Sequence, residues 1–235
     1  MIISHKHKFI FIKTHKTAGS SLEMALGALC GPEDIISSME TNDDSGIPRN
    51  YYATHFLGRL YQRSKLTRKW IHRHSRLIQP WYYEHMPAWR IREQVGADVW
   101  DSYYKFCFER NPWDKVVSYY LWKKYGQKKA LPSFEDYVLK KTHRLPADAQ
   151  LYCDKDGNCL VDQVYDFRNL ISEIASIYER IGLKFDGRLP KEKTEIKTDR
   201  KHYSHYYSES TKAKVAEVFQ SEIMLHNYSF ETEPA

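Results

Sequence analysis

The sequence has no long hydrophobic run. None of its apolar stretches approaches the roughly 20 residues that a membrane-spanning helix requires. Residues 1–6 also lack an apolar segment of the length found in signal peptides. We therefore expect no membrane span and a cytoplasmic location.

Cysteine is scarce, and its spacing does not suggest zinc. The chain has four cysteines, and no two pairs of them have the spacing of a zinc site, so we expect no metal centre. Cys30 and Cys107 lie in apolar segments, which predicts buried thiols. Cys153 and Cys159 flank a turn-rich hairpin tip and can face each other. A disulfide and two free thiols are both compatible with this arrangement.

Internal repeats, low-complexity tracts and an excess of acidic residues are also absent. The formal net charge is +6, which suits an anionic ligand or nucleic acid. With 42% hydrophobic residues, 235 positions are enough for one core, and we expect a single domain over residues 1–235.

The first informative motif begins with the apolar residues 9–12, which predict a buried parallel strand. A turn follows, and Ser20 and Glu23 then have the spacing of a capping box before a helix that Gly31 and Pro32 would end. Backbone N–H groups at such a helix start form an anion pocket. The residues of this pocket are Lys16, Thr17, Ala18, Gly19, Ser20 and Ser21.

This loop is not a Walker A loop, because the earlier glycine of that motif is missing. The absence disfavours an ordinary ATPase or GTPase. A P-loop-type nucleotide kinase remains an alternative function.

The second motif has the same order of strand, turn and helix. Residues 104–108 predict an apolar strand, Asn111 a helix N-cap and Pro112 the first helical position. Arg110 and Ser118 can converge on one phosphate, since the arginine fork binds phosphate oxygens in pairs. The alternative is that Arg110 forms a structural ion pair with Asp114 or Glu109.

The rest of the chain continues this alternation. Helices are expected over residues 87–95, 133–141, 169–181 and 210–225, and a strand over 162–167. Strands alternating with helices predict an α/β fold, a parallel sheet flanked by helices, with its ligand at the carboxyl ends of the strands.

Together the two motifs resemble those of the carbohydrate sulfotransferases that use 3′-phosphoadenosine-5′-phosphosulfate (PAPS). The closest group is the sulfotransferase-2-like set, with the heparan and chondroitin sulfotransferases and bacterial relatives. Residues 16–21 are similar to the family's 5′-phosphosulfate loop, and residues 110–114 with Ser118 to its 3′-phosphate motif. Thr14 and His15 replace the usual His-Ile-Pro approach.

The resemblance implies a P-loop-like sulfotransferase fold, PAPS as sulfuryl donor and a carbohydrate or polysaccharide acceptor, with no nucleic acid. It also implies that Lys16 stabilises charge on the leaving phosphate and that a base takes the proton of the acceptor hydroxyl. We assign the base to His85, with His55 as runner-up. Arg200 and Lys201 resemble a basic loop that covers the donor. This scheme requires no metal.

One further stretch supports a rival function. Residues 59–92 are rich in arginine, lysine and aromatic side chains, and Glu84 is their only acid. Such a surface suits a nonenzymatic binder of nucleic acid or acidic glycan.

Overall fold

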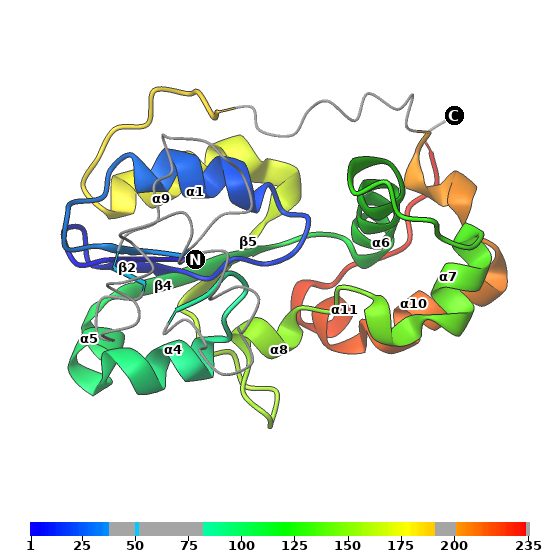
Figure 1. The fold of residues 1–235 in the computed structure, drawn as a ribbon, viewed down its shortest axis with the longest axis horizontal. Coiled ribbons are helices and arrows are strands. Elements are labelled where there is room, and N and C mark those ends of the chain that lie inside the picture. The colour runs from blue at the N-terminus through cyan, green and yellow to red at the C-terminus, as the bar shows by residue number, and fades with distance from the viewer. Residues whose placement is uncertain (38–49, 52–81, 191–200, 234–235) are drawn as a thin grey trace, which may run out of the picture.

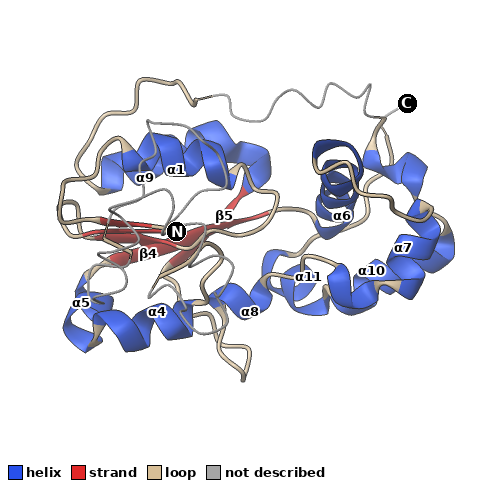
Figure 2. Ribbon diagram, in the orientation of Figure 1, coloured by secondary structure: helices blue, strands red, loops and turns tan. Residues whose placement is uncertain are grey.

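The computed structural model describes residues 1–37, 50–51, 82–190 and 201–233, and its centre is a five-stranded sheet (Figures 1 and 2). The strand order is β3-β1-β2-β4-β5. The strands are β1 (Ile2–Ser4), β2 (Phe9–Phe11), β3 (Ile35–Ile36), β4 (Tyr104–Glu109) and β5 (Gln163–Asp166). Strands β2, β4 and β5 are parallel, whereas β1 is antiparallel to both β2 and β3. The predicted α/β fold is confirmed. The strands β1 and β3 extend the parallel part of the sheet on one side through antiparallel pairings.

Helices cover both faces of the sheet, and a further group lies beside it (Figure 1). One face carries α1 (Gly19–Gly27) and α9 (Leu170–Arg180). The other carries α4 (Ala88–Val95), α5 (Ala97–Ser102) and α8 (Ala149–Tyr152). The group beside the sheet comprises α6 (Pro112–Leu121), α7 (Phe134–Lys140), α10 (Glu209–Val218) and α11 (Gln220–His226).

The two predicted strand-turn-helix units lie side by side. Strand β2 pairs with β4 in parallel, with Phe9 opposite Tyr104 and Phe11 opposite Phe106. Just past β2, the Ile12 amide donates to the carbonyl of Phe106 at 2.9 Å. Both motifs therefore leave the sheet at the same edge, as expected for parallel strands.

The central strands have two apolar faces, which is why they read as continuous hydrophobic runs. Phe9, Phe11 and Phe106 pack in one buried cluster with side chains of α1 and α9. Ile10 and Cys107 belong to a second cluster on the opposite face, with α4. A third cluster joins α6, α7 and α10. The prediction that Cys30 and Cys107 are buried is confirmed.

The structure corrects two helix predictions. Helix α1 ends at Gly27, earlier than Gly31 and Pro32. The helix expected over residues 210–225 is divided into α10 and α11 at Phe219, whose backbone is not helical. Phe219 is fully buried, so the break directs this large side chain into the core of the helical group.

Cys153 and Cys159 do face each other across an isolated antiparallel bridge, and both are free thiols. No helix in the described ranges is long and apolar enough to cross a membrane.

Candidate active site

The loop between β2 and α1 has an unusual backbone. Lys16 and Ala18 adopt left-handed conformations, with φ of 61° and 56°, which non-glycine residues rarely do. Ala18 is also the N-cap of α1, and no side chain caps the helix. The predicted capping box of Ser20 and Glu23 is therefore wrong. Strained residues of this kind persist only where surrounding contacts hold them.

Glu23 has a different partner from the one that the capping pattern suggested. It is fully buried and accepts a hydrogen bond from Lys13 Nζ at 2.5 Å, and it also binds the N-terminal amine of Met1. Lys13 forms a second ion pair with Glu84. Burial opposes the charge of Lys13, but the carboxylates of Glu23 and Glu84 raise its pKa. Lys13 therefore links the end of β2, helix α1 and the segment before α4.

The Lys13 side chain leaves no room for a side chain at position 19, so a glycine is needed there. A Cβ atom at position 19 would lie 2.8 Å from both Cγ and Cε of Lys13, and the Nζ of Lys13 is held by two carboxylates. The glycine therefore lets the Lys13 side chain cross the start of α1.

The second motif is built as predicted. The Asn111 side chain accepts a hydrogen bond from the Trp113 amide at 3.1 Å, and Pro112 is the first residue of α6. The ion pair proposed as the alternative role for Arg110 is also present, with Nε and Nη2 at 2.7 and 2.6 Å from Asp114.

Arg110 also joins the two motifs. Its Nη1 donates to the backbone carbonyl of Lys16 at 2.9 Å and lies 3.4 Å from Ser118 Oγ. The guanidinium packs over the Phe167 ring at 4.4 Å. The arginine and serine predicted to share a phosphate are thus adjacent, and both lie next to the first motif.

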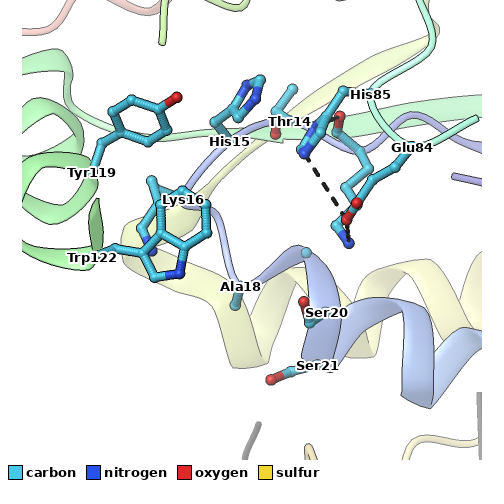
Figure 3. A pocket seen from close by; sticks show the side chains of 12 residues that line it. Thr14, His15, Lys16, Ala18, Ser20, Ser21, Glu84, His85, Tyr119 and Trp122 are labelled. Atoms are coloured by element: carbon cyan, nitrogen blue, oxygen red, sulfur yellow. Dashed lines mark hydrogen bonds and ion pairs between the residues drawn. The ribbon is translucent and has the colours of Figure 1, made fainter. Parts of the chain in front are cut away.

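The loop opens into a cavity of about 320 Å³ (Figure 3). Tyr119 and Trp122 lie on one side of it, Glu84 and His85 on the other, and Ser20 and Ser21 at the start of α1. The lining residues are Lys13, Thr14, His15, Lys16, Ala18, Gly19, Ser20, Ser21, Glu84, His85, Tyr119 and Trp122.

His85, the base predicted from sequence, therefore shares a cavity with Lys16. Its backbone is left-handed, with φ of 58°, and its Nδ1 lies 2.9 Å from the carbonyl oxygen of Lys13. Burial, and then the neighbouring His15, lower the pKa of His85 to about 4. The ring is therefore neutral at physiological pH.

Sequence reasoning missed several residues of the cavity wall. Lys16 Nζ lies 5.0 Å from the centroid of the Trp122 ring, a cation–π contact. Trp122 begins η2 (Trp122–Gly126), a π-helical turn that continues α6, and such turns are frequent at functional sites. Glu84 stood out in the sequence as the only acid of a basic stretch but was not assigned to the site; Tyr119 and Trp122 carry no such signal.

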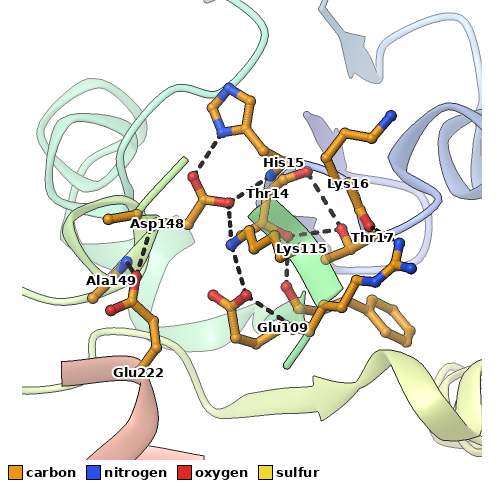
Figure 4. Close-up of polar contacts among 12 residues, drawn as sticks. Thr14, His15, Lys16, Thr17, Glu109, Lys115, Asp148, Ala149 and Glu222 are labelled. Atoms are coloured by element: carbon orange, nitrogen blue, oxygen red, sulfur yellow. Dashed lines mark hydrogen bonds and ion pairs between the residues drawn. The ribbon is translucent and has the colours of Figure 1, made fainter. Parts of the chain in front are cut away.

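A buried ionic network supports the loop from below (Figure 4). Lys115 is fully buried and lies 2.7 Å from Asp148 and 2.6 Å from Glu109. Burial opposes ionisation of Asp148, but Lys115 and then His15 lower its pKa to about 2. Burial raises the pKa of Glu109 to about 7. Asp148 therefore carries the negative charge that balances Lys115.

Thr17 is fully buried, and its hydroxyl lies 2.9 Å from that of Thr14, which donates to the Phe108 carbonyl.

Lys201 is exposed and does not line the cavity. His55, Arg200 and most of the stretch 59–92 lie outside the described residues. Within the described ranges, no three acidic, histidine or cysteine side chains are grouped so as to hold a metal ion.

The fold and site define a class of protein: an α/β protein with a lysine-bearing loop at the end of one strand and an arginine at the end of the next. The chain belongs to the Sulfotransferase family, whose match spans residues 1–229. The expected family resemblance is thus confirmed, and membership favours sulfuryl transfer.

Two relatives accompany this match. An uncharacterized protein of Archaeoglobus fulgidus is 40% identical over 100 residues, which are 42% of this chain and 83% of that protein. The crystal structure of a sulfotransferase from Alicyclobacillus acidocaldarius superposes with a TM-score of 0.45 at 15% identity, covering 95% of this chain and 96% of the other.

Proposed function

We propose that this protein transfers the sulfuryl group of PAPS to a hydroxyl of a carbohydrate. The observation that carries the proposal is the contact between the motifs, in which Arg110 reaches both Ser118 and the backbone of Lys16. Two adjacent anion-binding groups suit one ligand with a 3′-phosphate and a 5′-phosphosulfate. ATP carries no 3′-phosphate and would leave the proposed 3′-phosphate subsite at Arg110 and Ser118 unfilled.

The residues present fit such a donor. Left-handed residues at 16 and 18 lead into the start of α1, which no side chain caps, and backbone N–H groups in such turns can bind an anion. Residues 16–21 would hold the phosphosulfate, and Arg110 with Ser118 the 3′-phosphate. Arg200 and Lys201 are proposed to cover the donor.

PAPS supplies an activated sulfuryl group. The protein therefore has to position the donor and the acceptor and to stabilise the charge that develops during transfer. Lys16 would balance the negative charge that develops on the leaving phosphate. His85 would accept the proton of the acceptor hydroxyl through Nε2. Because Nδ1 faces a carbonyl oxygen, which can only accept, that nitrogen carries the hydrogen and leaves the Nε2 lone pair available.

The acceptor would enter from a second cavity of about 500 Å³, which shares His15 and Tyr119 with the first. Lys123, Lys129 and Arg144 line it and form no ion pair with any described carboxylate. The aromatic wall of Tyr119 and Trp122 suits the apolar face of a sugar. These features support an acidic carbohydrate as acceptor.

Single-turnover transfer from radiolabelled PAPS to a panel of acidic and neutral glycans tests the proposal. We expect label on at least one acidic glycan with the wild-type protein and a loss of about a hundredfold or more in Lys16→Ala. Transfer that occurs only from labelled ATP would identify a kinase instead. Retention of glycan without transfer would identify a binder.

A further inference from the structure

Two histidine rings lie face to face on the wall of the first cavity. The centroids of the His15 and His85 rings are 3.8 Å apart, and their planes differ by 9°. They come from segments 70 positions apart in the chain, the anion loop and the turn before α4. Only His85 was singled out by the sequence, because His15 lies inside the first motif and has no signal of its own.

His15 is held by a buried carboxylate. Its backbone amide donates to Asp148 Oδ2 at 2.6 Å, and its Nδ1 lies 2.6 Å from Asp148 Oδ1 (Figure 4). Asp148 is buried and ionised, and Lys115 holds it from the other side. The His15 ring therefore has a fixed plane and a fixed tautomer, with hydrogen on Nδ1.

This arrangement bears directly on the charge of His85. Two imidazolium rings at 3.8 Å would repel each other strongly. The titratable groups that face His85 are His15, Glu84 and Lys13, and of these only Glu84 favours a proton on the ring. Lys13 is itself neutralised by Glu23 and Glu84. A proton on His85 is therefore disfavoured by burial and by its stacked neighbour.

We propose that His15, clamped by Asp148, is a positioning residue for His85: its ring fixes the plane of the His85 imidazole and keeps that imidazole neutral, so that Nε2 is free to accept a proton. The inference rests on the proposed function. In the transfer step the acceptor O–H bond breaks and its proton moves to His85 Nε2. The acceptor oxygen bonds to sulfur, and the bond from sulfur to the phosphate oxygen breaks with its electron pair on the phosphate.

Two substitutions separate the contributions of His15. His15→Phe keeps an aromatic ring for stacking but loses the side-chain bond to Asp148, and His15→Gln keeps a side-chain donor for Asp148 but loses the ring. Neither variant carries a titratable group at position 15. We expect both to bind PAP, the desulfated donor, within about twofold of wild type, and His15→Gln to transfer at least about tenfold more slowly.

The pH profile of kcat/KM is the deciding readout, since it reports the free enzyme's essential base. We expect its acid limb near pH 4 in wild type, and a move upward by about half a unit or more in both variants. If His15 had a purely structural role, its substitution would lower the rate at every pH and leave the pH of the acid limb unchanged. An unmoved limb in both variants overturns the inference.

A ligand-free measurement separates this inference from the proposed function. NMR titration of the His85 ring needs neither PAPS nor an acceptor. A wild-type ring that titrates near pH 4, and higher in His15→Phe, supports the positioning role even if no transfer to any glycan is found. A wild-type ring that titrates near 6.5, the ordinary value, overturns it even if transfer is observed.

Discussion

The two strand-turn-helix motifs share one order of elements, yet they are stabilised in different ways. The second uses local devices, an asparagine cap and a proline at the first helical position. The first has a left-handed N-cap without a capping side chain and depends on Lys13, Glu23 and Glu84 instead. A regular turn keeps its shape by itself, whereas the strained turn needs partners from distant segments.

The difference has a functional reason. A side chain that capped α1 would compete with a ligand for the same backbone N–H groups. Around the first motif, the buried charges are instead paired with one another below and beside the loop. Helix α6 can be capped locally, because Arg110 is proposed to bind the donor with its side chain and not through the helix terminus.

The largest effect is expected from removing the buried cation beneath the first motif. Lys115→Ala removes the cation that balances Asp148 in a fully buried site, and should lower the free energy of unfolding by about 3–5 kcal/mol. Chemical denaturation measures this loss. Lys140→Ala, which breaks an exposed ion pair with Asp136, is the control and should leave the midpoint unchanged. Equal stability of the two variants would contradict the role of the network.

A smaller effect is expected from Gly19→Ala. The new Cβ must displace Lys13, which is fixed at its far end, and overpacking of this kind costs about 1–3 kcal/mol. The matched control is Gly27→Ala in the same helix, where the nearest side-chain atom is 3.5 Å away and alanine is the better helix former. Differential scanning calorimetry should show a lower Tm only for position 19; a loss at both positions would mean that helix α1 simply tolerates no change.

The smallest effect distinguishes the two helix starts. Asn111→Ala should cost about 1 kcal/mol because a true N-cap is lost, whereas Ser20→Ala should cost nothing measurable in the ligand-free protein. Asn111→Asp keeps the capping oxygen but loses the 2.8 Å bond from Nδ2 to the Ser229 carbonyl, so it separates the cost of that bond from the cost of the cap. If urea denaturation finds Ser20→Ala as damaging as Asn111→Ala, the first helix is capped after all.

The sequence was informative for most of the local signals, although not for the capping pattern of Ser20 and Glu23. Asn111 and Pro112 predicted the start of α6, and the apolar runs predicted β2 and β4, because burial on both faces leaves a continuous hydrophobic pattern. The break at Phe219 was not predictable, since the helical pattern continues through it and only tertiary packing selects the turn.

The sequence singled out residues of the candidate site that follow strand ends or precede helices, but it did not reveal the residues that support them. Lys16, Arg110 and His85 stand next to recognisable turns. Asp148 is 133 positions from His15, and no spacing rule connects such a pair. Glu23 had a local interpretation as a capping residue that proved wrong, because a buried lysine competes more strongly for its carboxylate.

The central claim is that the two motifs hold the two ends of one nucleotide, and calorimetry with PAP and AMP tests it most directly. AMP lacks the 3′-phosphate that Arg110 is proposed to bind. We predict that PAP binds wild type more tightly than AMP does, and that Arg110→Ala weakens PAP by about tenfold or more while leaving AMP unchanged. Because Arg110 also bonds to the Lys16 carbonyl, a purely structural arginine would weaken both ligands equally, and that result would contradict the account.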